Sequence, residues 1–173
     1  MIKEGSNWVK FCISKIPKQK RKYIVLDLAC GLGKNSVFLA KNFCTVISAD
    51  IDLVSLKSFH STSILKIQSD LEKIMAWPFA EEVFDIVVVT NFLNRKIFKN
   101  IENSIKKNGY LIYETFGEGQ EKFGRPKNKK FLLKKNELLT LTKNLQLIFY
   151  EEIKVISGNS KFIKNRILSK NVR

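Results

Sequence analysis

Short apolar runs alternate with longer, more polar segments along this chain of 173 residues. The densest runs are 23–29, 45–50, 84–90 and 110–116, and β-branched residues dominate the third of them. Continuous apolar runs are typical of strands buried on both faces of a parallel sheet. Their alternation with helical segments is the pattern of βαβ units. The sequence therefore predicts an α/β protein.

The full pattern predicts one Rossmann-like, doubly wound domain with a mostly parallel, seven-stranded sheet. The three further strands are expected at 64–68, 145–153 and 162–168. Helices are expected at 6–16, 35–42, 53–59, 97–106 and 136–143. In the second helix, Val37, Phe38 and Leu39 are expected to face the sheet. Asn108-Gly109 is a good stop for the fourth.

The organisation along the chain is expected to be simple. Residues 1–22 are interpreted as an N-terminal helix and basic linker, and residues 23–173 as the main domain. Residues 117–130 form a Gly- and Lys-rich segment that is long for a simple connection, and long ordered loops are often functional lids.

One segment, Val25–Ser36, carries most of the functional information. It places Asp27 inside the first strand, then Gly31 and Gly33 as Gly-x-Gly, then the start of a helix. We expect Gly31 to allow a tight turn and the bare Gly33 to let a ligand approach the backbone. A dinucleotide-binding fingerprint would need a third glycine where this chain has Ser36. A dehydrogenase is therefore disfavoured.

The string Val-Leu-Asp-Leu-Ala-Cys-Gly-Leu-Gly from Val25 to Gly33 resembles motif I of the class I methyltransferases that use S-adenosylmethionine (AdoMet). The resemblance covers about residues 23–116 and implies AdoMet as cofactor. It implies that Asp27 and the loop backbone receive the ammonium of AdoMet, that Asp50 takes the ribose hydroxyls, and that Asp70 contacts the adenine amino group. The cofactor residues implied are Asp27, Ala29, Gly31, Gly33, Asn35, Asp50, Ile51, Asp70, Leu71, Thr90 and Asn91.

Two further strings are similar to small bacterial methyltransferases of the tellurite-resistance type. They are Gly33-x-Asn35-Ser36 and the segment from Phe131 to Glu137-Leu138. Tyr113-Glu114-Thr115-Phe116 also looks like a signature of a bacterial methyltransferase group. These strings indicate a family without indicating a substrate.

Catalytic candidates are few, because in-line methyl transfer can depend on positioning alone. Glu114 lies in an apolar strand and is a candidate general base or anchor for a cationic substrate. Arg95 could hold a carboxylate or phosphate. Nothing near Cys30 activates it as a nucleophile, and the single histidine, His60, is expected to be structural. The residues expected to line the substrate pocket are Phe92, Phe116, Phe123 and Arg125.

The chain is strongly basic, with 31 Lys and Arg against 16 Asp and Glu, a formal net charge of +15. Such a surplus can mark a nucleic-acid partner, but the lysines are scattered through almost every segment. The leading hypothesis is therefore a small-molecule methyltransferase. An RNA or ribosomal-protein methyltransferase is the alternative, and a non-catalytic AdoMet-binding protein the third reading.

The cellular setting is expected to be the cytoplasm. The three cysteines show no metal-ligand spacing, which predicts neither a metal site nor a disulfide framework. No apolar run approaches the ~18 residues typical of a membrane span. We therefore expect no membrane or metal partner.

Overall fold

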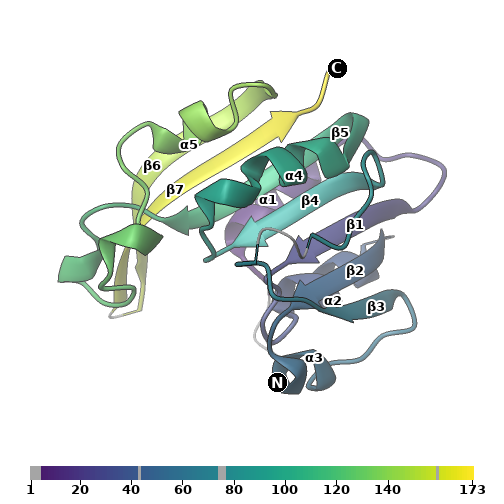
Figure 1. Cartoon of the computed structure of the whole chain (residues 1–173), viewed down its shortest axis with the longest axis horizontal. Helices are drawn as coiled ribbons and strands as arrows, with labels where there is room; N and C mark the ends of the chain where they lie inside the picture. The colour runs from purple at the N-terminus through teal and green to yellow at the C-terminus, as the bar shows by residue number, and fades with distance from the viewer. Residues whose placement is uncertain (1–4, 43, 74–76, 159) are drawn as a thin grey trace.

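A seven-stranded sheet is the centre of the molecule (Figure 1). The computed structural model describes residues 5–42, 44–73, 77–158 and 160–173. The strand order across the sheet is β3-β2-β1-β4-β5-β7-β6. The strands are β1 (Tyr23–Leu28), β2 (Cys44–Asp50), β3 (Ile64–Gln68), β4 (Phe84–Thr90), β5 (Ile105–Phe116), β6 (Gln146–Ser157) and β7 (Ser160–Lys170). The predicted fold class is confirmed.

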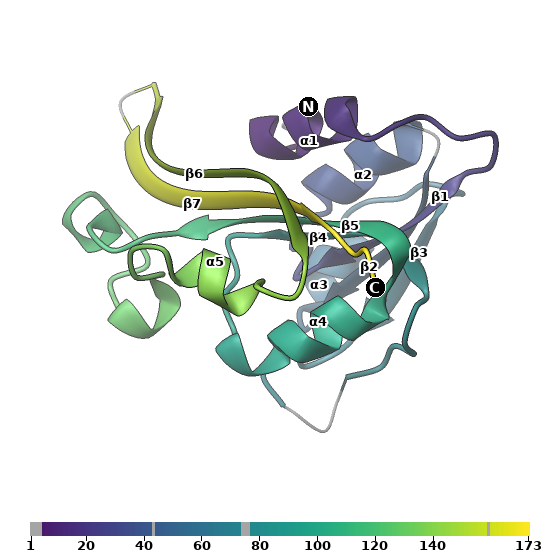
Figure 2. The ribbon, with the colours of Figure 1, turned by 90° about the horizontal axis from the view of Figure 1, so that it is seen from above.

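The strand directions create a crevice at one end of the sheet. Strands β1 to β5 are parallel, and β7 enters antiparallel between β5 and β6. The strand order reverses between β1 and β4, and open α/β sheets bind ligands outside the carboxyl ends of the strands at such a switch point. The long β6–β7 hairpin curves past the other strands (Figure 2).

Helices cover both faces of the sheet. Helices α1 (Asn7–Lys15), α2 (Lys34–Lys41) and α3 (Leu53–Lys57) contribute to one core cluster, and α4 (Phe98–Ser104) and α5 (Glu137–Leu141) contribute to the other. Side chains alternate between these clusters along β1, with Val25 on the α1 side and Leu26 on the α4 side, because successive strand residues point to opposite faces. Figure 2 shows α1 and α2 above the sheet and α4 and α5 below it.

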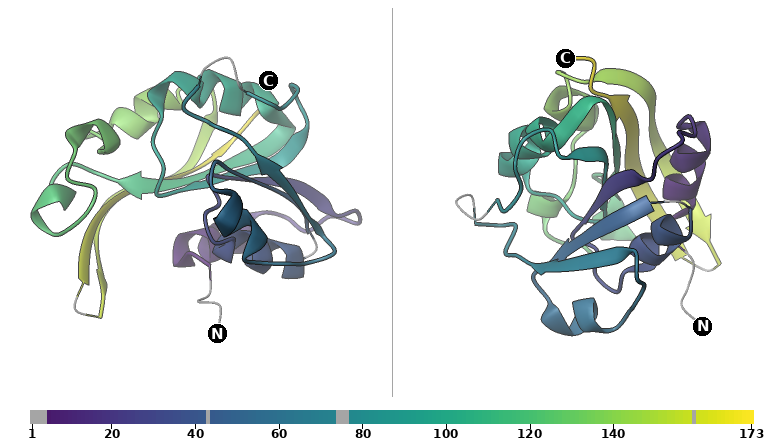
Figure 3. Two further views of the ribbon diagram at one scale, coloured as in Figure 1. Left: turned by 60° about the horizontal axis from the view of Figure 1, so that its bottom comes forward. Right: turned by 90° about the vertical axis from the view of Figure 1, so that its right-hand side faces the viewer.

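The segment after β5 lies beside the hairpin rather than on a face of the sheet (Figure 3). It contains two short 3-10 turns, η3 (Gln120–Lys122) and η4 (Lys129–Phe131). The Gln120 side chain accepts a hydrogen bond from the Ile163 N–H at 2.9 Å, which ties the segment to β7. Within the residues that the structure describes, every helix is too short or too polar to span a membrane.

The fourth helix and the following strand differ from expectation. The helix ends at Ser104, and Asn108-Gly109 lies inside β5 instead of ending a helix. Ile105 is already extended and pairs with Phe84. The Asn108 N–H then donates to the Asn171 carbonyl at 2.7 Å. The Asn-Gly signal therefore marks an irregularity within the strand, where the register with β4 shifts.

Helix α2 buries two polar side chains beside its apolar ones. Leu39 is buried as expected, and Val37 and Phe38 are partly buried and pack against the core on the α1 side. Asn35 and Ser36 are buried as well, and their hydrogen-bond partners beneath the helix start are described below. The inner face of this helix is therefore partly polar.

Candidate functional site

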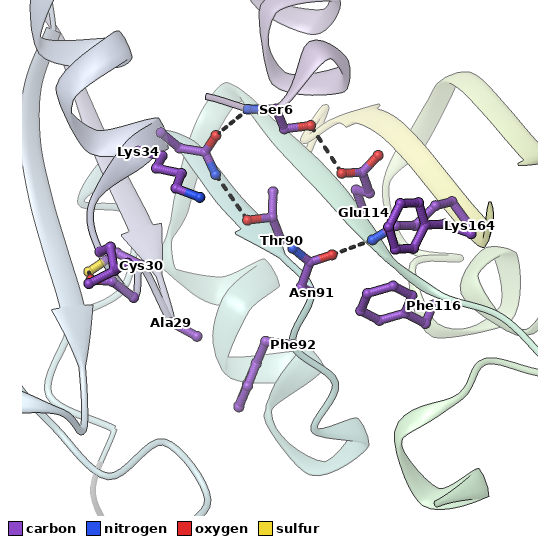
Figure 4. Close-up of a pocket in the computed structure, with 14 residues that line it drawn as sticks. Ser6, Ala29, Cys30, Lys34, Thr90, Asn91, Phe92, Glu114, Phe116 and Lys164 are labelled. Atoms are coloured by element: carbon purple, nitrogen blue, oxygen red, sulfur yellow. Dashed lines mark hydrogen bonds between the residues drawn. The ribbon is translucent and has the colours of Figure 1, made fainter. Parts of the chain in front are cut away.

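A cavity of about 560 Å³ opens at the carboxyl ends of β1, β4 and β5 (Figure 4). Four parts of the chain line it: the loop after β1, the start of α2, the end of β4, and the β5–β7 pair. Ser6, just before α1, closes one side. The predicted site residues on its wall are Ala29, Gly31, Asn35, Thr90, Asn91, Phe92, Glu114 and Phe116.

The loop after β1 is built from left-handed residues. Ala29, Gly31 and Gly33 have φ angles of 53°, 52° and 67°. A Cβ on Gly31 would meet no atom within 4 Å, so this residue leaves open space on the cavity side. A Cβ on Gly33 would come within 2.4 Å of the Phe59 ring. Gly33 is therefore needed for close packing against Phe59, which follows α3. Gly31 rather than Gly33 leaves the space expected for a ligand.

Asp50 fastens this loop to the end of β2. Its Oδ2 accepts the Gly31 N–H at 2.7 Å, and its Oδ1 accepts the Asp52 N–H at 2.9 Å. An ionised carboxylate has about four acceptor positions, so both oxygens can still receive hydroxyl groups. Ile51 follows with 58% of its surface exposed. Asp50 and Ile51 do not line the cavity; they lie at the carboxyl end of β2, beside the loop that follows β1.

Asp27 lies beneath the loop rather than on the cavity wall. It is fully buried and accepts a hydrogen bond from the Ser36 hydroxyl at 2.5 Å, and its Oδ1 has no hydrogen-bond partner. The Ser48 hydroxyl donates to Ser36 at 2.7 Å. Burial raises the pKa of Asp27 to about 7. Direct contact with the ammonium of a ligand, as the resemblance implies, does not fit a side chain enclosed by the sheet.

Asp70 and Leu71 follow β3 and lie outside the cavity wall. The Asp70 carboxylate accepts the Glu72 N–H at 3.0 Å and pairs with Lys73 at 3.6 Å. The Leu71 side chain is buried in the α4-side core. Only its backbone is therefore placed to contact a ligand.

A chain of hydrogen bonds crosses the cavity wall from α2 to β5. Asn35 donates from Nδ2 to the Thr90 hydroxyl at 2.9 Å, and its Oδ1 accepts the Ser6 N–H at 2.8 Å. The Ser6 hydroxyl donates to Glu114 Oε1 at 3.0 Å. All three bonds are drawn as dashed lines in Figure 4. The N-terminus of α1 is thereby fixed against the end of β4 and the middle of the sheet.

Glu114, a predicted catalytic residue, is on the wall but is committed to an ion pair. Arg166 Nε donates to Glu114 Oε2 at 2.6 Å, and Arg166 Nη1 contacts Glu151 at 2.9 Å. The guanidinium also lies 5.6 Å from the centroid of the Trp8 ring. With both of its oxygens bonded, Glu114 is placed to orient its neighbours.

Lys164, on β7, is the unexpected member of the wall. Its side chain is buried, its Nζ donates to Asn91 Oδ1, and it lies 3.5 Å from the centroid of the Phe116 ring. Burial lowers the pKa of Lys164 to about 8, with Arg166 acting in the same direction and Glu114 opposing them. Figure 4 shows Lys164 meeting Asn91 beside Phe116.

A second cavity of about 520 Å³ adjoins the first. The two share Asn91, Phe92 and Phe116 in their walls. Arg125 lines the second cavity, as expected of a substrate-pocket residue. Phe123 belongs to neither wall: it is 45% exposed, and Lys154 lies over its ring.

Arg95 does not line either of these two cavities. It forms two hydrogen bonds with Glu137, at 2.6 and 2.9 Å, and donates to the carbonyls of Lys130 and Leu132. Its hydrogen bonds to Glu137 raise the pKa of this guanidinium above its ordinary value. Its donors are occupied by the chain, so Arg95 clamps the segment after β5 onto α5 instead of holding a substrate, contrary to expectation.

Sequence reasoning did not single out Ser6, Phe162, Lys164 or Arg166. Antiparallel pairing places Phe116 opposite Lys164 and Glu114 opposite Arg166. The signal available in the sequence was the spacing of Lys164 and Arg166, since residues two apart in a strand share a face. Their partner strand could not be predicted from the sequence. β7 pairs with its sequence neighbour β6 on one side, but on its other side it pairs with β5.

Comparison with known proteins gives a consistent result. Residues 25–109 match the family model described as a methyltransferase domain. The chain is 30% identical over 122 residues to "Putative methyltransferase YqeM" of Bacillus subtilis, an alignment that covers 62% of this chain and 47% of that protein. The chain thus spans about half the length of this curated relative.

Two solved structures share the fold. TehB from Haemophilus influenzae superposes with a TM-score of 0.78 at 22% identity, covering 96% of this chain and 62% of that one. The geranyl diphosphate C-methyltransferase of Streptomyces coelicolor was solved with Mg²⁺, geranyl diphosphate and S-adenosyl-L-homocysteine. It superposes with a TM-score of 0.73 at 12% identity, covering 95% of this chain and 76% of that one.

Proposed function

We propose that this chain, which resembles the class I AdoMet-dependent methyltransferases in sequence and fold, transfers a methyl group from AdoMet to a small molecule. The observation that supports the proposal best is the pair of adjoining cavities. One is bordered by the glycine loop, the other by aromatic and basic side chains, and Asn91, Phe92 and Phe116 stand between them. A donor and an acceptor need such neighbouring sites.

The residues around the first cavity fit AdoMet. The open left-handed turn at Gly31 exposes backbone toward the cavity, and the spare acceptor positions of Asp50 suit ribose hydroxyls. We propose that Ala29, Gly31, Asn35, Thr90 and Asn91 hold the amino-acid end. Asp50, Ile51, Asp70 and the Leu71 backbone would hold the nucleoside, and Asp27 would act indirectly, by bracing the loop through Ser36.

AdoMet, when bound, supplies an electrophilic methyl group on its sulfonium sulfur. The chain's own contribution is to hold the acceptor in line and to exclude water, which can provide much of the rate enhancement. Phe92 and Phe116 provide apolar walls where the cavities meet. The Ser6–Glu114–Arg166 network keeps β5, β7 and the start of α1 in fixed positions around them.

Cavity size favours a small acceptor, because both volumes fall in the range of ~300–1,000 Å³ typical of small-molecule sites. Geranyl diphosphate, present in the Streptomyces structure, is also a small molecule. The net charge of +15 keeps RNA as the second candidate.

Methyl-labelled AdoMet tests the proposal directly. The protein is incubated with the label and a bacterial extract, which is then separated into small-molecule, RNA and protein fractions. We expect label in a small product that survives ribonuclease and protease treatment. Label that appears in RNA or protein instead would contradict the small-molecule proposal, and AdoMet binding without any transfer would indicate a non-catalytic protein.

A further inference from the structure

Lys164 occupies a position that the proposed cofactor contacts do not explain. It is only 7% exposed, yet its side chain lines the first cavity at the place where the second cavity begins. A lysine ammonium has three donors. The structure gives this ammonium one hydrogen-bond acceptor, the side-chain oxygen of Asn91, and one ring, that of Phe116.

The nearby acidic residues do not neutralise Lys164. Among the described residues, no carboxylate oxygen lies within 4.0 Å of its Nζ, and both oxygens of Glu114 are bonded to Arg166 and Ser6. Glu151 is likewise paired with Arg166. Buried charges are normally paired, because burial without a counter-charge is costly. Among the described residues, the ammonium therefore has no carboxylate in direct contact.

The backbone at Asn91 adopts a left-handed conformation, and its side-chain amide lies against Lys164. Asn91 has a φ of 57°, in the left-handed region. Its N–H donates to the Glu114 carbonyl at 2.8 Å, and its side chain reaches Lys164. A neutral amide can orient an ammonium but cannot balance its charge. Asn91 thus leaves the remaining donors of Lys164 available to a ligand.

We propose that Lys164 binds an anionic group of the methyl acceptor, so that the substrate class is a small apolar or aromatic carboxylate or phosphate. This inference rests on the proposed function and specifies its acceptor. The apolar body would lie between Phe92 and Phe116, which both cavities share. Arg125, on the wall of the second cavity, adds a second positive charge on the approach.

The charged groups that face Lys164 are Glu114 on β5, Arg166 on its own strand and, through Arg166, Glu151 on β6. The pKa of Lys164 near 8 then sets the direction of the pH dependence. The ammonium is present below that pH and lost above it. Binding of an anion should therefore weaken as the pH rises from 7 to 9. A general base at this position would give the opposite profile of activity.

Calorimetry with benzoate, phenyl phosphate and octanoate as probes tests the proposal, with benzamide as the neutral isostere of benzoate. Each probe is titrated into the protein with and without saturating S-adenosylhomocysteine. We expect at least one anion to bind more tightly than benzamide. Lys164→Met should weaken that anion about tenfold to a hundredfold, as for a hydrogen bond to a charged group, whereas Lys164→Arg should retain most of the affinity.

Lys154→Met is the matched control, because Lys154 also lies over a phenylalanine ring, that of Phe123, but is exposed and outside both cavity walls. It should leave anion binding unchanged. Urea unfolding of Lys164→Met separates loss of binding from loss of folding, and Lys164→Arg tests the charge if the Met variant fails to fold.

The inference would be overturned by equal binding of benzoate and benzamide, by anion binding that Lys164→Met leaves unchanged, or by an equal loss of S-adenosylhomocysteine affinity in that variant. An equal loss of S-adenosylhomocysteine affinity would mean that Lys164 binds the cofactor and not the methyl acceptor. A wild-type protein that binds S-adenosylhomocysteine but no anionic probe would contradict this inference alone. Anion binding through Lys164 without any S-adenosylhomocysteine binding would support the anion site and contradict the proposed function.

Discussion

At the scale of single residues, Ala29 is the clearest case of local strain. It has a φ of 53° without being glycine, and a left-handed L-residue costs roughly 1–2 kcal/mol. We expect Ala29→Gly to stabilise the protein by about 0.5–1 kcal/mol, after the extra chain entropy of glycine is subtracted. Urea unfolding measures the change.

Ala49→Gly is the matched control, since Ala49 is buried in β2 and has no left-handed backbone. This substitution should destabilise the protein by roughly 0.5–1 kcal/mol or more. If both variants lose stability, the backbone at Ala29 is not strained as described.

Asp27 predicts a distinctive dependence of stability on pH. Burial raises its pKa to about 7 in the folded protein, whereas an unfolded chain releases this proton near pH ~4. The folded state therefore holds the extra proton between these values, and this residue's contribution to the free energy of unfolding falls as the pH rises from about 4 to 7.

Asp27→Asn removes the titrating group and keeps an acceptor for Ser36. Denaturant unfolding at several pH values compares it with the wild type. We expect the wild type to lose stability relative to the variant between about pH 4 and 7. Carboxylates with lowered pKa values, such as Asp85 and Glu137, cancel in this difference. Parallel profiles would mean that Asp27 is not buried as a protonated acid.

At the scale of elements, one buried ion pair joins the side chains of β5 and β7. The side chains of Arg166 and Glu114 are 14% and 7% exposed. Arg166→Met should cost about 3–5 kcal/mol, because it leaves Glu114 buried without a counter-charge. The double variant Glu114→Gln with Arg166→Met should recover a large part of the loss.

Arg21→Met provides the comparison for thermal or urea unfolding. The Arg21 side chain is 55% exposed. After its replacement, the partner Asp85 would still accept a hydrogen bond from the Ile24 N–H and pair with Lys106. We expect Arg21→Met to lower the free energy of unfolding by at most about 1 kcal/mol. A similar cost for Arg166→Met, or no recovery in the double variant, would contradict the importance given to the buried pair.

The elements also show what the sequence could and could not predict. Strands such as 84–90 were predictable, because dense β-branched runs have few alternatives in an α/β chain. The Asn108-Gly109 signal was misleading, because pairing of Ile105 with Phe84 had already extended the chain. Lys164 was not predicted, since its role depends on a partner strand about fifty residues away in sequence, and such pairings leave no local signal.

The same limit explains the roles of Asp27 and Arg95. The spacing of motif I located the glycine loop. It did not show that Asp27 would be buried beneath the loop with a hydrogen bond from Ser36. Likewise, the position of Arg95 after β4 did not reveal that Glu137 and two carbonyls would occupy its donors. The sequence can predict which side chains lie near a site, but their contacts in the folded chain determine which way they point.

At the scale of the whole molecule, the charge of +15 predicts weak, non-specific RNA binding. Structured RNA should bind at low salt and lose about a hundredfold in affinity between 50 and 150 mM salt, if about five phosphates are neutralised. Filter binding at the two salt concentrations measures this. The first set of residues to neutralise is the basic cluster after β5, which consists of Lys122, Arg125, Lys127, Lys129 and Lys130.

The control neutralises five exposed lysines elsewhere: Lys41, Lys57, Lys96, Lys99 and Lys143. Similar effects of the two sets would agree with diffuse electrostatics. Tight binding at physiological salt that is lost only with the first set would favour RNA as the substrate.

Calorimetric titration with S-adenosylhomocysteine tests the central claim most directly, because it asks whether the glycine-loop cavity is an AdoMet site. We predict a dissociation constant in the micromolar range, about −8 kcal/mol. Asp50→Ala should weaken it by roughly 1.5–3 kcal/mol, and Asp52→Asn, which retains the cap of α3, should not. No heat with S-adenosylhomocysteine or AdoMet but clear binding of NAD would contradict the account.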